Sequence, residues 1–149
     1  MKHTIAVLVE NHFGVLSRVS GLFSGRGFNI DSLAVGETED PTVSRMTIVV
    51  KGDDRTLEQV KKQLNKLIEV IKVIDLTEKP HVDRELLLIK VTVTPKTRSQ
   101  IIEVAELLQA RTVSVGPKSL SLEIVGESAH IENSLNLLRP FGIREVVRT

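Results

Sequence analysis

The chain has 149 residues, 41% hydrophobic but only 3% aromatic, so any core must be built from aliphatic side chains. Twenty Lys and Arg against nineteen Asp and Glu leave a formal net charge of +1. This balance does not provide the positive electrostatic field that binding to a nucleic-acid phosphate backbone requires. The absence of cysteine excludes disulfides and thiolate chemistry. The first apolar run is too short for a signal peptide or a membrane span, and we expect a soluble, cytoplasmic protein.

The first third of the chain alternates strand and helix patterns. Residues 4–9 are apolar and β-branched, which predicts a buried strand. From Val15 the apolar residues fall at helical spacing, and the helix should stop at the glycines that begin with Gly25. Strands are predicted at residues 29–35 and 44–51, on either side of a polar turn.

A second helix follows, and either Asp53 or Asp54 can cap it. Its apolar positions recur with helical period and are Leu57, Val60, Leu64, Leu67 and Ile71. Residues 72–76 then resemble a fourth strand. The polar, proline-containing stretch 78–83 is expected to be a linker between a first domain, residues 1–77, and a second, residues 84–149.

The second domain repeats the order of the first. Residues 86–94 predict a strand, residues 99–110 a helix, and residues 112–115 and 120–125 a hairpin. The apolar positions of one last helix are Ile131, Leu135 and Leu138, and a final strand covers residues 143–148. Both halves therefore read βαββαβ, which predicts an α+β protein of two ferredoxin-like sandwiches. One sheet face or edge of each would stay open, so we expect a dimer.

The segment from Asn11 to Ile30 carries the candidate site. Gly14 stands between a strand and a helix, where the first helical N–H groups, near Val15 and Leu16, can receive a carboxylate. Asn11 and Asn29 offer amide groups, and Ile30 an aliphatic wall, as a small apolar amino acid would need. Strand-to-helix turns with Gly and Asn are common, so from spacing alone Gly14 could simply be a turn and Asn29 a residue that tolerates a left-handed backbone.

The same residues resemble the ACT-domain signature, in which Gly-x-Leu opens a helix and Asn-Ile begins the next strand. The longer run VLVENHFGVLSRVSGLFSGRGFNIDSLAV, followed by DPTVSRMTI, closely resembles the small regulatory subunit of acetohydroxyacid synthase (acetolactate synthase). A looser likeness lies in LLRPFGI near the end. Phe13 departs from many ACT domains, which have Pro before the helix-opening Gly.

The resemblance implies a non-catalytic subunit that activates a catalytic subunit and confers allosteric feedback inhibition by a branched-chain amino acid, generally valine. Thiamine diphosphate, Mg²⁺ and FAD would be bound by the catalytic subunit and no cofactor by this chain. The effector would lie at the interface of two ACT domains. Asn11, Gly14, Val15 and Leu16 would come from one subunit, and Asn29 and Ile30 from the other.

Other functions find less support in the residues. The histidines, His3, His12, His81 and His130, have no partner at metal-ligand spacing, and no catalytic grouping stands out. Binding RNA by base stacking needs exposed aromatics on adjacent strand positions, and the four Phe residues, Phe13, Phe23, Phe28 and Phe141, are not arranged in that way. A stand-alone ACT-repeat sensor of another pathway remains the alternative, with a small enzyme on a ferredoxin-like fold behind it. Valine, leucine and isoleucine should compete, since one methylene contributes only about 1–3 kcal/mol to such discrimination.

Overall fold

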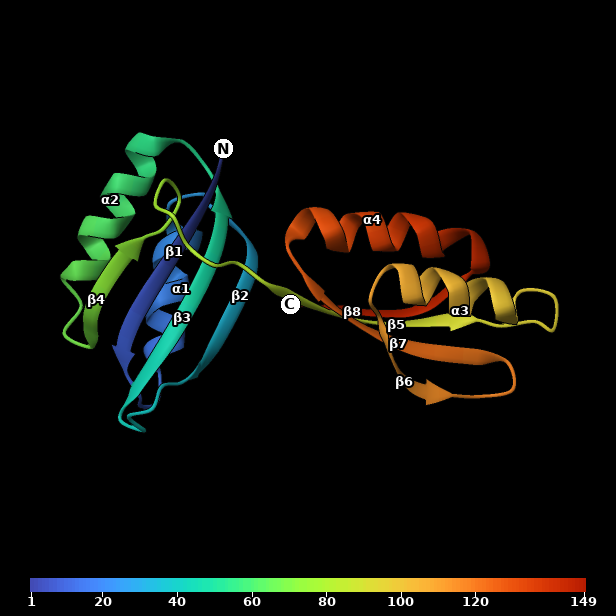
Figure 1. Cartoon of the computed structure of the whole chain (residues 1–149). Coiled ribbons are helices and arrows are strands. Elements are labelled where there is room, and N and C mark those ends of the chain that lie inside the picture. Colours follow the sequence, from blue (N-terminus) through green and yellow to red (C-terminus); the bar gives the residue numbers. More distant parts are fainter. The chain divides into compact units, whose positions relative to one another are not determined.

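The computed structural model describes residues 1–149 as two compact units, Met1–His81 and Val82–Thr149 (Figure 1). The division falls inside the stretch 78–83 that we expected to be a linker. None of the helices is both long enough and apolar enough to cross a lipid bilayer.

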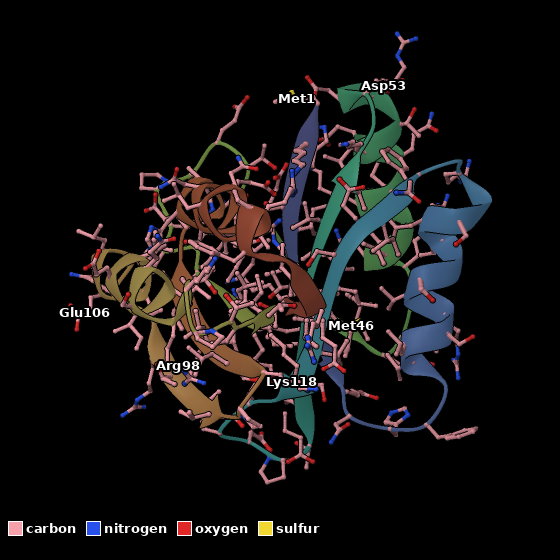
Figure 2. The ribbon with its side chains drawn as sticks, turned by 90° about the vertical axis from the view of Figure 1, so that its right-hand side faces the viewer. Met1, Met46, Asp53, Arg98, Glu106 and Lys118 are labelled. Carbon is pink, nitrogen blue, oxygen red and sulfur yellow. The ribbon has the colours of Figure 1, made fainter.

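The first unit is a four-stranded antiparallel sheet with two helices on one face (Figure 2). The strands lie in the order β2-β3-β1-β4, so β2 and β4 are the edges. In chain order its elements are β1 (Lys2–Glu10), α1 (Val15–Gly25), β2 (Asn29–Glu37), β3 (Val43–Lys51), α2 (Asp54–Asn65) and β4 (Val70–Asp75).

The core of the first unit lies between the sheet and the two helices. Alternate residues of β1 and β3 face the helices, as the strand period requires, and are fully or almost fully buried: Ile5, Val7, Val9, Met46, Ile48 and Val50. The helices contribute Val19, Phe23, Leu57, Val60 and Leu64. The ring of Phe23 meets Phe28 edge to face, with centroids 6.3 Å apart.

The second unit has the same topology, with strand order β6-β7-β5-β8. Its elements are β5 (Glu85–Thr92), α3 (Arg98–Leu107), β6 (Arg111–Val115), β7 (Ser119–Gly126), α4 (Ser128–Leu138), a short 3₁₀ turn (Arg139–Phe141) and β8 (Ile143–Arg148). The predicted buried face of β7 is confirmed, because Leu120, Leu122 and Ile124 are all buried. The predicted α+β fold of two βαββαβ sandwiches is confirmed as well.

Two predicted helices were too long. Asp53 caps α2 by accepting the Thr56 N–H at 2.7 Å, but the helix ends at Asn65 instead of continuing to Ile71. Ile71 lies on β4, which starts two residues before the predicted strand, and is 54% exposed. Leu67 lies in the turn beyond the helix but still packs on the core. An apolar residue is therefore needed there, and it happens to continue the helical spacing of α2.

The helix predicted to reach Ala110 ends at Leu107. Gln109 adopts a left-handed backbone with φ 56°, and the Ala110 N–H bonds the Ala105 carbonyl at 2.8 Å. This geometry closes a helix, and it does so here without the glycine that usually signals it.

Candidate functional site

The loop between β1 and α1 leaves the start of the helix open. Gly14 occupies the N-cap with φ 86° and supplies no capping side chain. The Val15 N–H reaches only the His12 carbonyl, at 3.5 Å, and the N–H groups of Leu16 and Ser17 have no protein acceptor. Unpaired N–H groups at the positive end of a helix dipole attract an anion such as a carboxylate.

Asn11 fixes this loop against the connection between β2 and β3. Its main-chain N–H donates to the Thr42 carbonyl at 2.7 Å. Its side-chain Nδ2 donates to Glu37 Oε1 at 3.2 Å and to the Pro41 carbonyl at 2.9 Å. Because Nδ2 is held in this way, the amide oxygen Oδ1 remains available to accept a hydrogen bond from a ligand.

The structure brings together four of the six predicted site residues and leaves two apart. Asn11, Gly14, Val15 and Leu16 lie at the end of the sheet where Glu37 pairs with Ser44. Asn29 and Ile30 lie at the opposite end of β2, where Asn29 pairs with Lys51. Asn29 is exposed, and its Nδ2 donates to Asp31 Oδ1 at 3.0 Å. Within one chain the six residues do not form a single site.

β2 is an edge strand that carries exposed apolar side chains. Leu33 is 40% exposed and Val35 46% exposed. They pair with Ile48 and Met46, which face the helices, so both lie on the helix-covered side of the sheet. An unpaired strand edge with apolar side chains is suited to pairing with another strand.

An ion pair that the sequence reading did not identify lies beside the start of α1. Arg18 Nη1 binds Glu69 Oε1, and the Glu69 side chain is only 10% exposed. Arg18 lies four residues after Gly14, so helical spacing alone could have placed it on the same face. No local sequence pattern identifies Glu69 as the partner of Arg18, because the two residues are fifty-one positions apart in the chain.

Phe13, next to Gly14, is 100% exposed. The substitution that separates this loop from many ACT domains therefore places an aromatic ring in solvent at the mouth of the candidate site. Leu16, in the first turn of α1, is 44% exposed and adds a second apolar side chain that faces solvent near this loop.

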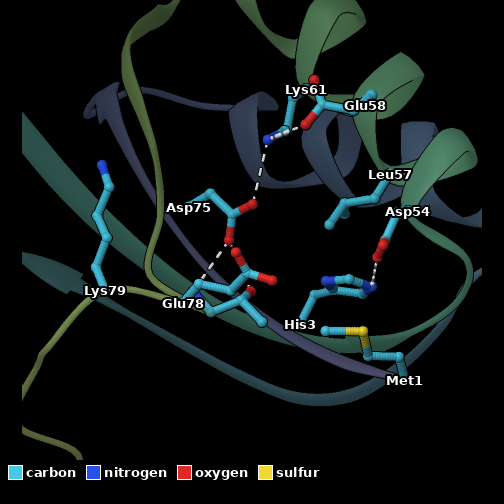
Figure 3. Close-up of a pocket in the computed structure, with 10 residues that line it drawn as sticks. Met1, His3, Asp54, Leu57, Glu58, Lys61, Asp75, Glu78 and Lys79 are labelled. Carbon is cyan, nitrogen blue, oxygen red and sulfur yellow. Dashed lines mark hydrogen bonds and ion pairs between the residues drawn. The ribbon is translucent and has the colours of Figure 1, made fainter.

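A separate hollow of about 520 Å³ is lined by residues of β1, α2 and the end of β4 (Figure 3). His3 is buried there, with Nε2 3.2 Å from the Gly52 carbonyl oxygen and 3.4 Å from Asp54 Oδ1. Lys61 Nζ lies 3.1 Å from Asp75 Oδ2. None of the predicted site residues lines this hollow, and no three of its acidic and histidine side chains are grouped as a metal site would need.

The pKa of Asp75 reflects opposing influences. Burial raises it, but hydrogen bonds from the Thr77 hydroxyl and N–H and from Lys61, together with the Lys61 charge, outweigh burial, so the pKa lies below its ordinary value. The hydrogen bond to Glu58 raises the pKa of Lys61 most; burial lowers it, and the hydrogen bond to Asp75 and the two carboxylate charges raise it further, so the pKa lies above its ordinary value. These groups satisfy one another, which is typical of a structural network.

The comparisons with known proteins cover both units. Residues 5–72 match the family described as an AHAS small subunit-like ACT domain, and residues 84–149 match the family described as the small subunit of acetolactate synthase. A probable acetolactate synthase small subunit of Archaeoglobus fulgidus is 54% identical over 149 residues, which is 100% of this chain and 93% of that protein. The acetolactate synthase small subunit of Mycobacterium leprae is 54% identical over 99% of this chain and 87% of its own length.

Among solved structures, the acetolactate synthase small subunit of Thermotoga maritima superposes with a TM-score of 0.91. The two sequences are 40% identical, and the match covers 100% of this chain and 93% of that one. At this level of similarity both the sequence and the arrangement of the elements agree along the whole chain.

Proposed function

Because this chain belongs to the acetolactate synthase small subunit family and is thus a regulatory subunit, we propose that it activates the catalytic subunit and confers feedback inhibition by valine. Family membership implies a catalytic large subunit as partner. Thiamine diphosphate, Mg²⁺ and FAD would be carried by that subunit.

The start of α1 is the observation that supports valine as the effector. Its carboxylate would accept from the Leu16 and Ser17 N–H groups, which have no protein acceptor. Its ammonium group would donate to the free amide oxygen of Asn11. Its isopropyl group would meet apolar surface at Leu16 and Phe13, both of which are exposed in the single chain. Leucine and isoleucine carry the same carboxylate and ammonium groups and a branched aliphatic side chain, so they would compete for the site.

Pairing of two copies through β2 would complete this site. In an antiparallel pair centred on Leu33, a residue four positions before the centre faces one four positions after it. Asn29 of the partner subunit would then lie opposite Glu37, whose carboxylate accepts from Asn11 at 3.2 Å. This pairing would also cover the exposed side chains of Leu33 and Val35.

A site shared in this way explains how a small ligand could regulate. A ligand that touches both subunits binds some subunit arrangements better than others, and only such differential binding shifts an equilibrium. A coupling of about 1–3 kcal/mol between effector binding and the active arrangement is typical of allosteric proteins.

The test is reconstitution with the purified catalytic subunit. Acetolactate formation should be absent with this chain alone, low with the catalytic subunit alone, and raised when both are present. Valine should then lower the rate of the mixture without affecting the catalytic subunit alone. A chain that binds valine but neither copurifies with the catalytic subunit nor changes its rate would instead be a sensor of another pathway.

A further inference from the structure

The ion pair between Arg18 and Glu69 joins two segments that frame the proposed effector site. Arg18 is in the first turn of α1, and its main-chain N–H donates to the Gly14 carbonyl at 3.2 Å. Glu69 precedes β4, and its carbonyl accepts the Glu10 N–H at 2.8 Å. The acidic partner is therefore fixed to the end of β1, and its side chain is nearly buried.

Arg18 extends toward the open end of the helix. A Cβ placed on Gly14 would lie 3.7 Å from Arg18 Nη2. The guanidinium thus stands in van der Waals reach of the space above Gly14, the space that a ligand must enter to meet the free N–H groups of Leu16 and Ser17. The missing side chain of Gly14 keeps this space open.

Only part of the guanidinium is occupied by the ion pair. Nη1 bonds Glu69, whereas Nη2 has no protein acceptor, and the Arg18 side chain is 55% exposed. A guanidinium presents N–H donors on several edges, so one edge can be anchored while another binds an anion. The first turn of α1 contains no acidic residue that would compete for it.

We propose that Arg18 is the specificity-determining residue for the carboxylate of the effector, held in position over Gly14 by the buried Glu69. This inference rests on the proposed function, because it names a further residue of the same site. Arg18 would donate from Nη2 to the effector's carboxylate while the helical N–H groups bind it from below. Effectors that lack the negative charge would lose this contact.

The experiment compares L-valine with L-valinamide, which has the same side chain and ammonium group but no carboxylate. Binding to the full-length chain is followed by NMR titration, which measures affinities into the millimolar range. Arg18→Gln should weaken valine binding by about tenfold to a hundredfold, as expected for a hydrogen bond to a charged group. The affinity for valinamide should stay as in the unaltered chain.

Two further variants control for charge and folding. Arg111→Gln removes the same charge from an exposed position in the second unit and should leave valine binding unchanged. Arg18→Lys keeps the charge and should restore part of the affinity that Arg18→Gln loses. Equal losses for valine and valinamide in Arg18→Gln would overturn the proposal, since they would mean that the site had collapsed.

The outcomes separate this inference from the proposed function. If the unaltered chain binds valine and Arg18→Gln binds it equally well, Arg18 has no role and the effector site stands without it. If the unaltered chain binds neither valine nor another branched-chain amino acid, the proposed function itself fails.

Discussion

The side-chain amide of Asn11 donates to Glu37 Oε1 at 3.2 Å, which ties the loop before α1 to the last residue of β2. The same amide donates to the Pro41 carbonyl at 2.9 Å. The open helix start is thereby attached to the edge strand through which two copies are proposed to pair. The proposed effector site and the proposed subunit pairing would thus share one set of contacts.

Asn11→Ala should therefore weaken valine inhibition. This effect should exceed its effect on the free energy of unfolding. The substitution removes the hydrogen bonds that hold the loop and the proposed acceptor for the ammonium group. We expect the valine concentration for half inhibition to rise by about tenfold, the effect of losing a hydrogen bond to a charged group. Asn136→Ala, at an exposed position on α4, is the matched control. An inhibition curve that coincides with that of the control would remove Asn11 from the site.

Subunit pairing through β2 can be tested with a pair of lysine substitutions on opposite edges of the same sheet. Val35 on β2 is 46% exposed and Ile71 on β4 is 54% exposed. Val35→Lys should convert the dimer to a monomer, because it places a charge inside the proposed interface. Ile71→Lys should remain dimeric. Sedimentation equilibrium measures both masses, and a dimeric Val35→Lys chain would contradict pairing through β2.

The network around Asp75 predicts a pH-dependent contribution to stability. Its carboxylate bonds Thr77 Oγ1 at 2.6 Å and Lys61 Nζ at 3.1 Å, and its pKa in the folded chain lies below the ordinary value of 3.8. A carboxyl with a lowered folded pKa stabilises the protein at pH above 3.8, and this contribution is lost as pH falls through the folded pKa.

Asp75→Asn should thus lower the free energy of unfolding by about 1 kcal/mol at neutral pH, a typical value for one hydrogen bond. The difference from the unaltered chain should shrink as the solution is acidified below the pKa of a free aspartate. Denaturant titrations at several pH values measure it. Asp83→Asn, at an exposed position outside the network, should show no such trend. If Asp75→Asn lowered the free energy of unfolding by the same amount at all pH values, the proposed link between stability and the protonation of Asp75 would be wrong.

Local periodicity was sufficient to predict most of the fold. The bounds of β8 agree with the predicted strand 143–148, and the alternation of Leu120, Leu122 and Ile124 identified the buried face of β7. The helix α2 was predicted too long because an apolar residue beyond its end continues the helical spacing. Leu67 packs on the core from a turn, so the apolar pattern of α2 continues two residues beyond Asn65.

The candidate site was harder to predict because its contacts join distant segments. Gly14 was predicted as a site residue from its place between a strand and a helix. The partner of Arg18, Glu69, has no pattern in the sequence, since ion pairing depends on where β4 begins relative to β1. In the single subunit Asn29 lies at the far end of β2, so its predicted role in the site depends on a second copy of the chain.

Asn29→Ala tests whether the second subunit contributes to the effector site. The Asn29 side chain is exposed and bonds only its near neighbour Asp31, at 3.0 Å, so its loss should leave thermal stability almost unchanged. Valine inhibition should weaken by about tenfold if the amide binds a charged group of the effector. Mixing this chain with Gly14→Asp chains extends the test. One of the two sites of a mixed dimer would then carry neither change, and part of the valine response should return.

Gly14→Asp is expected to abolish sensing while activation survives. The substitution places a Cβ 3.7 Å from Arg18 Nη2 and a carboxylate over the Leu16 and Ser17 N–H groups, so the protein's own side chain would occupy the place of the effector's carboxylate. The backbone at φ 86° disfavours any side chain by about 1 kcal/mol, although aspartate tolerates this region better than most.

Gly14→Ala carries the same backbone strain without the charge and serves as the control. Reconstituted with excess catalytic subunit, the Asp variant should reach the full activated rate and need more than about a hundredfold higher valine for inhibition, whereas the Ala variant should respond at intermediate concentrations. Since none of these groups is proposed to touch the catalytic subunit, activation should be equal in both. Unchanged valine inhibition in Gly14→Asp would reject the site at the start of α1. Joint loss of activation and inhibition would instead show that the β1–α1 loop docks the catalytic subunit.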